Sequence, residues 1–120
     1  MSLRDQLKVM VESVGGGMGA VIMGYDGIAI DEYIKPEATI DIQMMAVEYA
    51  AMLKEIKKTI EVLNSGTVEE ISINTDRAQV LIRVIDEDFF VVMALQSEGN
   101  YGKGRYLLRV EAPELHAGLQ

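Results

Sequence analysis

The chain has 120 residues, of which 49% are hydrophobic and 25% charged, and this composition predicts one globular domain spanning residues 1–120. Its net charge of −8 argues against nucleic acid as a partner, because phosphate binding needs an excess of Lys and Arg. The absence of cysteine excludes disulfides and thiolate metal sites, while the lack of a leader or of an apolar run near 20 residues predicts a cytoplasmic protein that enters no membrane.

A short helix and a β-hairpin are predicted first. Apolar residues recur at helical spacing over residues 3–14, and the three glycines at 15–17 end the helix. Residues 20–23 then have the composition of a strand, and Asp26-Gly27 is a hairpin turn signal. The second strand of the hairpin is marked by Ile28, Ile30 and Ile34.

The next predicted element is a long helix over residues 39–64. Pro36 ends the preceding strand, Thr39 is the expected N-cap, and the Asn-Ser-Gly sequence at 64–66 stops the helix. At about 100° per residue, one apolar stripe is expected to face the sheet. This stripe consists of Ile42, Met45, Tyr49, Met52, Leu53, Ile56, Ile60 and Leu63. A second stripe, about 160° away on the N-terminal half, consists of Ile40, Met44, Val47 and Ala51.

Three strands and a helix complete the chain. The strands are expected at residues 70–74, 79–84 and 89–96, and the turns between them are short enough only for antiparallel connections. Nearly every residue of the last strand is apolar, so it is expected at the centre of the sheet with helices on both faces. Residues 101–115 are predicted to form a closing helix that Pro113 limits. This order of elements predicts an α+β domain.

The second stripe of the long helix predicts a partner. A helix that lies on a sheet buries one stripe, so a second apolar stripe needs another cover or stays exposed as scattered surface methionines and aliphatics. The strand at 70–74 offers a possible edge, whose free backbone groups can pair with the same strand of a second copy. We therefore predict a homodimer. The interface residues expected are Glu70, Ile71, Ser72, Ile73, Asn74, Met44, Val47 and Ala51.

No group of residues predicts catalysis. The Gly-rich sequence at 15–20 formally fits a dinucleotide fingerprint, but it lies between a helix and a strand, the reverse of the order that phosphate binding requires. The sequence at 99–104, with Lys103, lies in the right order but lacks the spacing of a phosphate loop and the hydroxyl residue for magnesium, which makes nucleotide binding the weaker interpretation. We predict no enzyme, and no catalytic, cofactor-binding or metal-binding residues.

Two segments resemble a known family. Residues 21–30, Val-Ile-Met-Gly-Tyr-Asp-Gly-Ile-Ala-Ile, resemble the first hairpin of the roadblock/LC7 family, and residues 100–109 are similar to that family's Asn-x-Gly-x-x-Arg entry into its last helix. The resemblance covers nearly the whole chain. It implies a five-stranded antiparallel sheet with the long helix on one face and the two shorter helices on the other. It also implies dimers in which the third strands pair and the long helices lie together.

Within this family, the chain looks most similar to the bacterial gliding-regulator B type, whose members activate a Ras-like small GTPase in cell polarity and motility. The resemblance therefore implies a homodimeric regulator that binds such a GTPase and stimulates GTP hydrolysis. The alternative is a dimeric scaffold or light-chain module with no effect on hydrolysis. Arg77 is the one arginine expected at a loop tip, either as an ordinary turn residue or as an arginine finger. The residues expected on the GTPase platform are Ile40, Met44, Val47, Glu48, Ala51 and Glu55.

Overall fold

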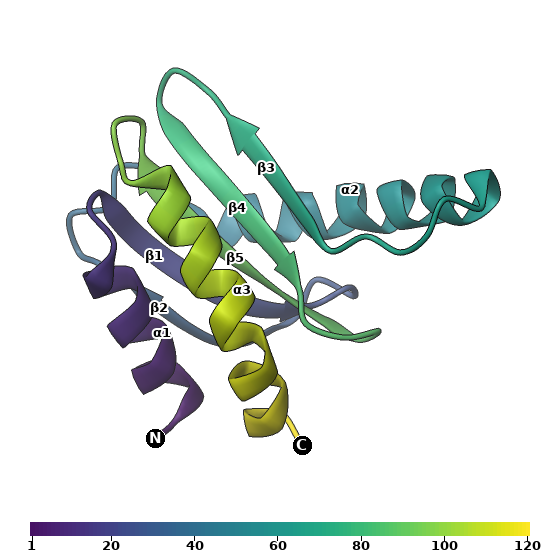
Figure 1. Ribbon diagram of the computed structural model, residues 1–120. Helices are drawn as coiled ribbons and strands as arrows, with labels where there is room; N and C mark the ends of the chain where they lie inside the picture. The colour runs from purple at the N-terminus through teal and green to yellow at the C-terminus, as the bar shows by residue number, and fades with distance from the viewer.

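A computed structural model describes residues 1–120 as three helices and one five-stranded sheet. The strand order is β2-β1-β5-β4-β3 and every neighbouring pair is antiparallel. In Figure 1, α2 crosses one face of the sheet, and α1 and α3 lie on the other. This confirms the predicted fold class. The elements in chain order are α1 (Leu3–Ser13), β1 (Gly17–Gly24), β2 (Ala29–Ile34), α2 (Ile42–Leu63), β3 (Glu70–Asn74), β4 (Ala78–Val84), β5 (Phe89–Gln96) and α3 (Tyr101–Gly118).

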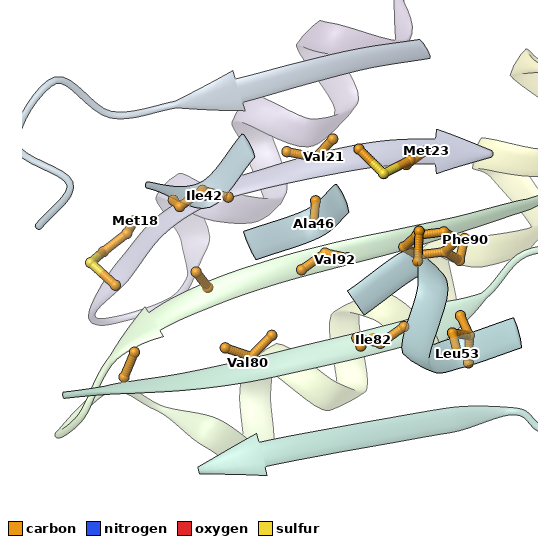
Figure 2. Close-up of a cluster of buried hydrophobic side chains, with 13 residues drawn as sticks. Met18, Val21, Met23, Ile42, Ala46, Leu53, Val80, Ile82, Phe90 and Val92 are labelled. Atoms are coloured by element: carbon orange, nitrogen blue, oxygen red, sulfur yellow. The ribbon is translucent and has the colours of Figure 1, made fainter. Parts of the chain in front are cut away.

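The central strand β5 divides the core into two layers. Its successive side chains point to opposite faces, as in any strand, and six of its eight residues are buried. Figure 2 shows the layer under α2, which contains Phe90 and Val92 of β5 beside Ile42, Ala46 and Leu53 of α2. The layer under α1 and α3 contains Val91, Met93 and Leu95 together with Leu7, Val11, Leu108 and Leu115. The predicted central position of this strand is confirmed.

Two glycine-rich loops meet at one end of the sheet. Gly16 has a φ of 83°, and a Cβ atom on it would lie 2.6 Å from the Cα of Gly99. The carbonyl groups of Gly15 and Gly16 accept hydrogen bonds from the backbone N–H groups of Asn100 and Gln96. The loop before β1 is thereby joined to the loop that precedes α3, which explains why both are rich in glycine.

The start of α2 differs from the prediction. The helix begins at Ile42 and its N-cap is Asp41, whose carboxylate accepts from the Met44 backbone N–H at 3.0 Å. Thr39 instead lies in the preceding segment, where its hydroxyl donates to Met18 Sδ. Asp is as good a cap as Thr, so the sequence offers two start sites and the packing of Ile42 against the core selects the second.

The stripe of α2 that faces the sheet also differs from the prediction. The buried residues of this helix are Ile42, Ala46, Ala50 and Leu53, so two alanines occupy positions where larger residues were expected. Met52 is 37% exposed and Leu63 is 67% exposed, and both were wrongly assigned to the sheet-facing stripe. Alanine lets the helix approach the sheet closely, which rotates Met52 outwards.

The last helix passes through Pro113. It was predicted to end near this residue but continues to Gly118. A proline within a helix lacks one backbone hydrogen bond, to the carbonyl four residues earlier. Complete burial of Leu115 and a hydrogen bond of 2.9 Å between His116 Nδ1 and Asp86 Oδ2 hold the final turns. None of the three helices is long and apolar enough to cross a lipid bilayer.

Candidate protein-interaction surface

The outer face of α2 carries most of the predicted platform. Met44 is 59% exposed and Val47 is 46% exposed, and Glu48, Ala51 and Glu55 are exposed beside them. These residues lie on the side of the helix turned away from the sheet, as the second apolar stripe requires. We call Met44, Val47, Glu48, Ala51 and Glu55 the α2 outer face.

Ile40 does not belong to this surface. It precedes the first turn of α2 and is half-buried against the core layer beneath that helix. The helical projection that placed Ile40 on the second stripe assumed a helix from Thr39, and the later start removes it. Of the six residues expected on the platform, the five other than Ile40 are exposed on the outer side of α2.

The C-terminal half of α2 is only partly covered by the rest of the chain. Leu53 is the last buried residue of the helix, and Figure 1 shows the end of α2 projecting past β3. Val62 and Leu63 are exposed at the tip, while Ile56 and Ile60 are half-buried. The apolar stripe therefore continues beyond the single domain that would cover it, which leaves an open hollow of about 560 Å³ beside Ile60 and Val68.

The strand β3 is an edge with unused backbone groups. Two backbone hydrogen bonds show which residues of β3 bond to β4: the Val84 N–H donates to the Glu69 carbonyl, and the Thr75 N–H donates to the Ala78 carbonyl. Because bonded pairs alternate along antiparallel strands, the N–H and C=O groups of Ile71 and Ile73 point towards β4. Those of Glu70, Ser72 and Asn74 point to the free edge. A second strand can pair there without disturbing the existing ladder.

The other edge, β2, is better protected. Its register with β1 shifts between Ile22 and Met23, and its middle carries two acidic residues, Asp31 and Glu32. Arg4 from α1 also donates to the backbone carbonyl of Glu32 at 3.1 Å. Bulges and charges are the usual means by which proteins block an edge, and β3 has neither a bulge nor a lysine or proline.

Ionisable side chains hold the turns at one end of the sheet together. Burial, with contributions from Asp86 and Asp88, raises the pKa of Tyr25 to about 12, and Lys57 lies 3.9 Å from the centre of its ring. Burial favours the neutral form of Asp86, but hydrogen bonds from the Asp88 N–H, from His116 and from the Phe89 N–H outweigh it and lower the Asp86 pKa. These contacts fasten both hairpin turns and the end of α3.

The two remaining sequence candidates have structural explanations. Arg77 is exposed in the turn between β3 and β4, where its backbone N–H donates to Thr75 Oγ1, as expected of a turn residue. Asn100 caps α3: its side chain accepts from the Lys103 N–H and its carbonyl from the Gly104 N–H. Two of the amides that would meet a phosphate are therefore already bonded.

Comparison with known proteins agrees with this architecture. No family model and no curated protein matches the chain. Among solved structures, MglC from Myxococcus xanthus is 41% identical over 98% of both chains, with a TM-score of 0.70. A roadblock/LC7 domain from Streptomyces avermitilis is 13% identical over 99% of this chain and 98% of the other, with a TM-score of 0.84. The gliding protein MglB from Thermus thermophilus is 13% identical over 94% and 84% of the two chains, with a TM-score of 0.82.

The sheet with one long helix on one face and two shorter helices on the other is the roadblock/LC7 fold. The chain belongs to the roadblock/LC7 family, and its full-length similarity to MglC places it among relatives of the bacterial Mgl proteins. The resemblance seen in two short segments of sequence is thereby confirmed. Likeness to MglB, at 13% identity, extends to the fold, whereas likeness to MglC extends to the sequence.

Proposed function

We propose that the protein is a homodimer in which β3 of one copy pairs with β3 of the other. The main support is the unprotected β3 edge beside the uncovered end of α2. Pairing about a two-fold axis would join the two sheets and bring the C-terminal half of each α2 over the other copy. It would cover the apolar residues at the end of α2 that this chain leaves exposed. Glu70, Ile71, Ser72, Ile73 and Asn74 are the proposed strand contacts.

We further propose that the α2 outer faces of the two copies form a docking platform for a regulatory partner. The leading candidate is a Ras-like small GTPase of a gliding-motility system, whose GTP hydrolysis the dimer would stimulate without supplying a catalytic centre. No arginine lies on the α2 outer face, so stimulation would act by holding the switch segments of the GTPase in place. Met44 and Val47 are the exposed apolar residues best placed to anchor the partner.

A scaffold function is the second candidate. The activating role follows from the resemblance to the MglB type, and the likeness to MglB of Thermus thermophilus, at 13% identity, extends to the fold alone. A dimer that binds another protein through the same α2 outer face, without changing nucleotide hydrolysis, would use the same geometry. The activating and scaffold functions would therefore use the same α2 outer face and differ only in their effect on the bound partner.

The dimer is tested by Ser72→Pro. Proline removes a backbone N–H that faces the free edge and leaves the β3–β4 ladder intact, so the variant should fold and sediment as a monomer at micromolar concentration. The wild type should sediment at about twice the chain mass. Ser72→Ala is the matched control: it retains the N–H and should remain dimeric, although it loses the hydrogen bond to the Tyr101 hydroxyl. A monomeric wild type would refute the proposed pairing.

The platform is tested by Val47→Arg with GTP-loaded Ras-like GTPase from the same genome. A charged residue at a buried apolar contact should weaken complex formation at least tenfold, because it loses its hydration there. Val9→Arg is the control, since Val9 is 54% exposed on α1, on the opposite face of the sheet. If the wild type binds the GTPase but leaves its rate of GTP hydrolysis unchanged, the scaffold function is favoured. Equal binding by the two variants would exclude the α2 outer face as the docking site.

A further inference from the structure

The face of the sheet opposite α2 carries a concentration of arginines. Arg105 and Arg109 lie one turn apart on α3, and Arg83 lies on the neighbouring strand β4. Two hollows, of about 180 and 230 Å³, follow the side of α3 and share Arg109 as a wall. Arg105 and Tyr106 line the first hollow, and Arg83 and His116 line the second. We call these four residues and Arg109 the arginine groove.

The arginine groove brings three arginines together in a chain whose net charge is −8. Glu70 is shared between Arg105, which it pairs with directly, and Arg83, at 3.7 Å. Glu69 reaches Arg83 at the outer limit of an ion pair, 4.0 Å. Arg109 forms no ion pair, and Arg83 Nε is buried without a hydrogen-bond acceptor. Three guanidinium groups thus lie near three carboxylates: Glu70 is shared by Arg83 and Arg105, Glu69 is 78% exposed, and Asp86 is bonded to His116, which leaves Arg109 without a partner.

Guanidinium groups in such a place recognise carboxylates. The planar fork of arginine can match a carboxylate with two parallel hydrogen bonds. Arg105 already binds one carboxylate, since its Nε and Nη2 both donate to Oε1 of Glu70. The rings of Tyr101 and Tyr106 lie within 6 Å of Arg105 and Arg109 and hold these side chains along the groove. The arrangement presents several fixed anion-binding groups in a row.

The dimensions favour an extended ligand over a compact one. From Gly102 to His116, α3 rises about 21 Å, a length that about six residues of extended chain would cover. Arg105 and Arg109 are about 6 Å apart along the helix, close to the roughly 6.7 Å between alternate side chains of an extended peptide. A single phosphate would reach only one or two of the arginines. Alternate acidic residues would match the row.

We propose that the arginine groove binds an extended acidic peptide segment of a partner protein. The groove lies on the α1 and α3 face, opposite the proposed platform on α2. Glu70 at its border belongs to the proposed dimer strand β3, but the three arginines lie on α3 and β4. This second docking surface therefore goes beyond the proposed function and does not depend on it. Carboxylates of the peptide would pair with Arg109 and Arg83 and compete with Glu70 for Arg105.

The test measures binding of a fluorescein-labelled peptide of four Glu-Ser repeats to the full chain at low salt. Arg109→Glu should weaken binding at least tenfold, because it reverses the one arginine that has no internal partner. Arg77→Glu is the matched control, since it changes the net charge equally but lies in the turn between β3 and β4. It should bind like the wild type. The same peptide with Gln in place of Glu should not bind, and added salt should weaken the Glu-Ser complex.

Several results would overturn the proposal. One is failure of the wild type to bind the Glu-Ser peptide. Another is an equal loss of peptide affinity in Arg109→Glu and Arg77→Glu, which would mean that net charge alone attracts the peptide. Displacement of the peptide by an equal concentration of inorganic phosphate would assign the groove to a compact anion. Displacement by an equal concentration of oligothymidylate would assign it to single-stranded nucleic acid.

Discussion

Gly104 shows how one residue fixes the position of the last helix. It is buried where α3 crosses the sheet, and a Cβ atom on it would lie 2.7 Å from Leu81 Cδ1 and 3.3 Å from Leu95 Cδ1. Both leucines belong to the tightly packed layer under α3, where they cannot move without disturbing their neighbours.

Gly104→Ala should therefore destabilise the protein. Overpacking a filled core costs about 1–3 kcal/mol, and the better helix propensity of alanine offsets up to about 1 kcal/mol of that cost. Gly102→Ala, two residues earlier in the same helix, is the control, because nothing lies within 4 Å of its Cβ position. It should leave the free energy of unfolding unchanged or raise it slightly. Urea denaturation measures both; equal effects would mean that Gly104 matters only through helix propensity.

At the scale of elements, the start of α2 positions the whole outer face. Asp41 caps the helix and Ile42 enters the core in the first turn, so the direction of every later side chain is set there. A helix that began at Thr39 would have included Ile40 in its outer stripe. The later start removes Ile40 from that stripe and leaves it with the core, while Met44 and Val47 remain exposed on it.

Asp41→Ala should lower the free energy of unfolding by about 1 kcal/mol, the usual cost of losing an N-cap. Thr39→Ala, at the position that sequence reasoning favoured, should cost less, because the Thr39 hydroxyl meets only a methionine sulfur at 3.5 Å. The two variants are compared by thermal or urea unfolding monitored by circular dichroism. A larger loss for Thr39→Ala would show that the helix starts earlier.

The positions of the helices and strands were predicted well from the sequence, whereas the buried side of each element was predicted less well. The bounds of β3 and β5 were predicted without error, because turns and apolar runs are local signals. The inward position of Ala46 and Ala50 was missed, since small residues give a weak hydrophobic signal even when packing requires them. The passage of α3 through Pro113 depends on burial of Leu115, and the arginine groove brings together residues that are far apart in the sequence, at 83, 105, 106, 109 and 116. Neither is visible before the chain is folded.

At the scale of the whole molecule, α2 is longer than the sheet that supports it. The segment after Leu53 has no buried residue, and a helix of this kind receives little stabilisation from its own hydrogen bonds in water. The proposed dimer would supply the missing contact. Helical order at the end of α2 would then depend on association with the second copy.

Amide hydrogen exchange provides a measurement of this dependence. Backbone amides from Lys54 to Leu63 should exchange at least tenfold faster in monomeric Ser72→Pro than in the dimeric wild type, because local opening no longer breaks an interface. Amides of β5 serve as the internal control, since this strand is central and should exchange at similar rates in both proteins. Equal protection of the α2 end in both would mean that its helix is stable without a partner.

The alternating side chains of β5 have a consequence for signalling between the two faces. Phe90 and Val92 contact the layer that supports α2, whereas Val91 and Met93 contact the layer that supports α3, and no side chain of the strand serves both. A ligand in the arginine groove and a partner on the α2 outer face would therefore influence each other only by changing the sheet backbone between them. Two partners could bind at once with nearly independent affinities, which is the behaviour of an adaptor that joins proteins.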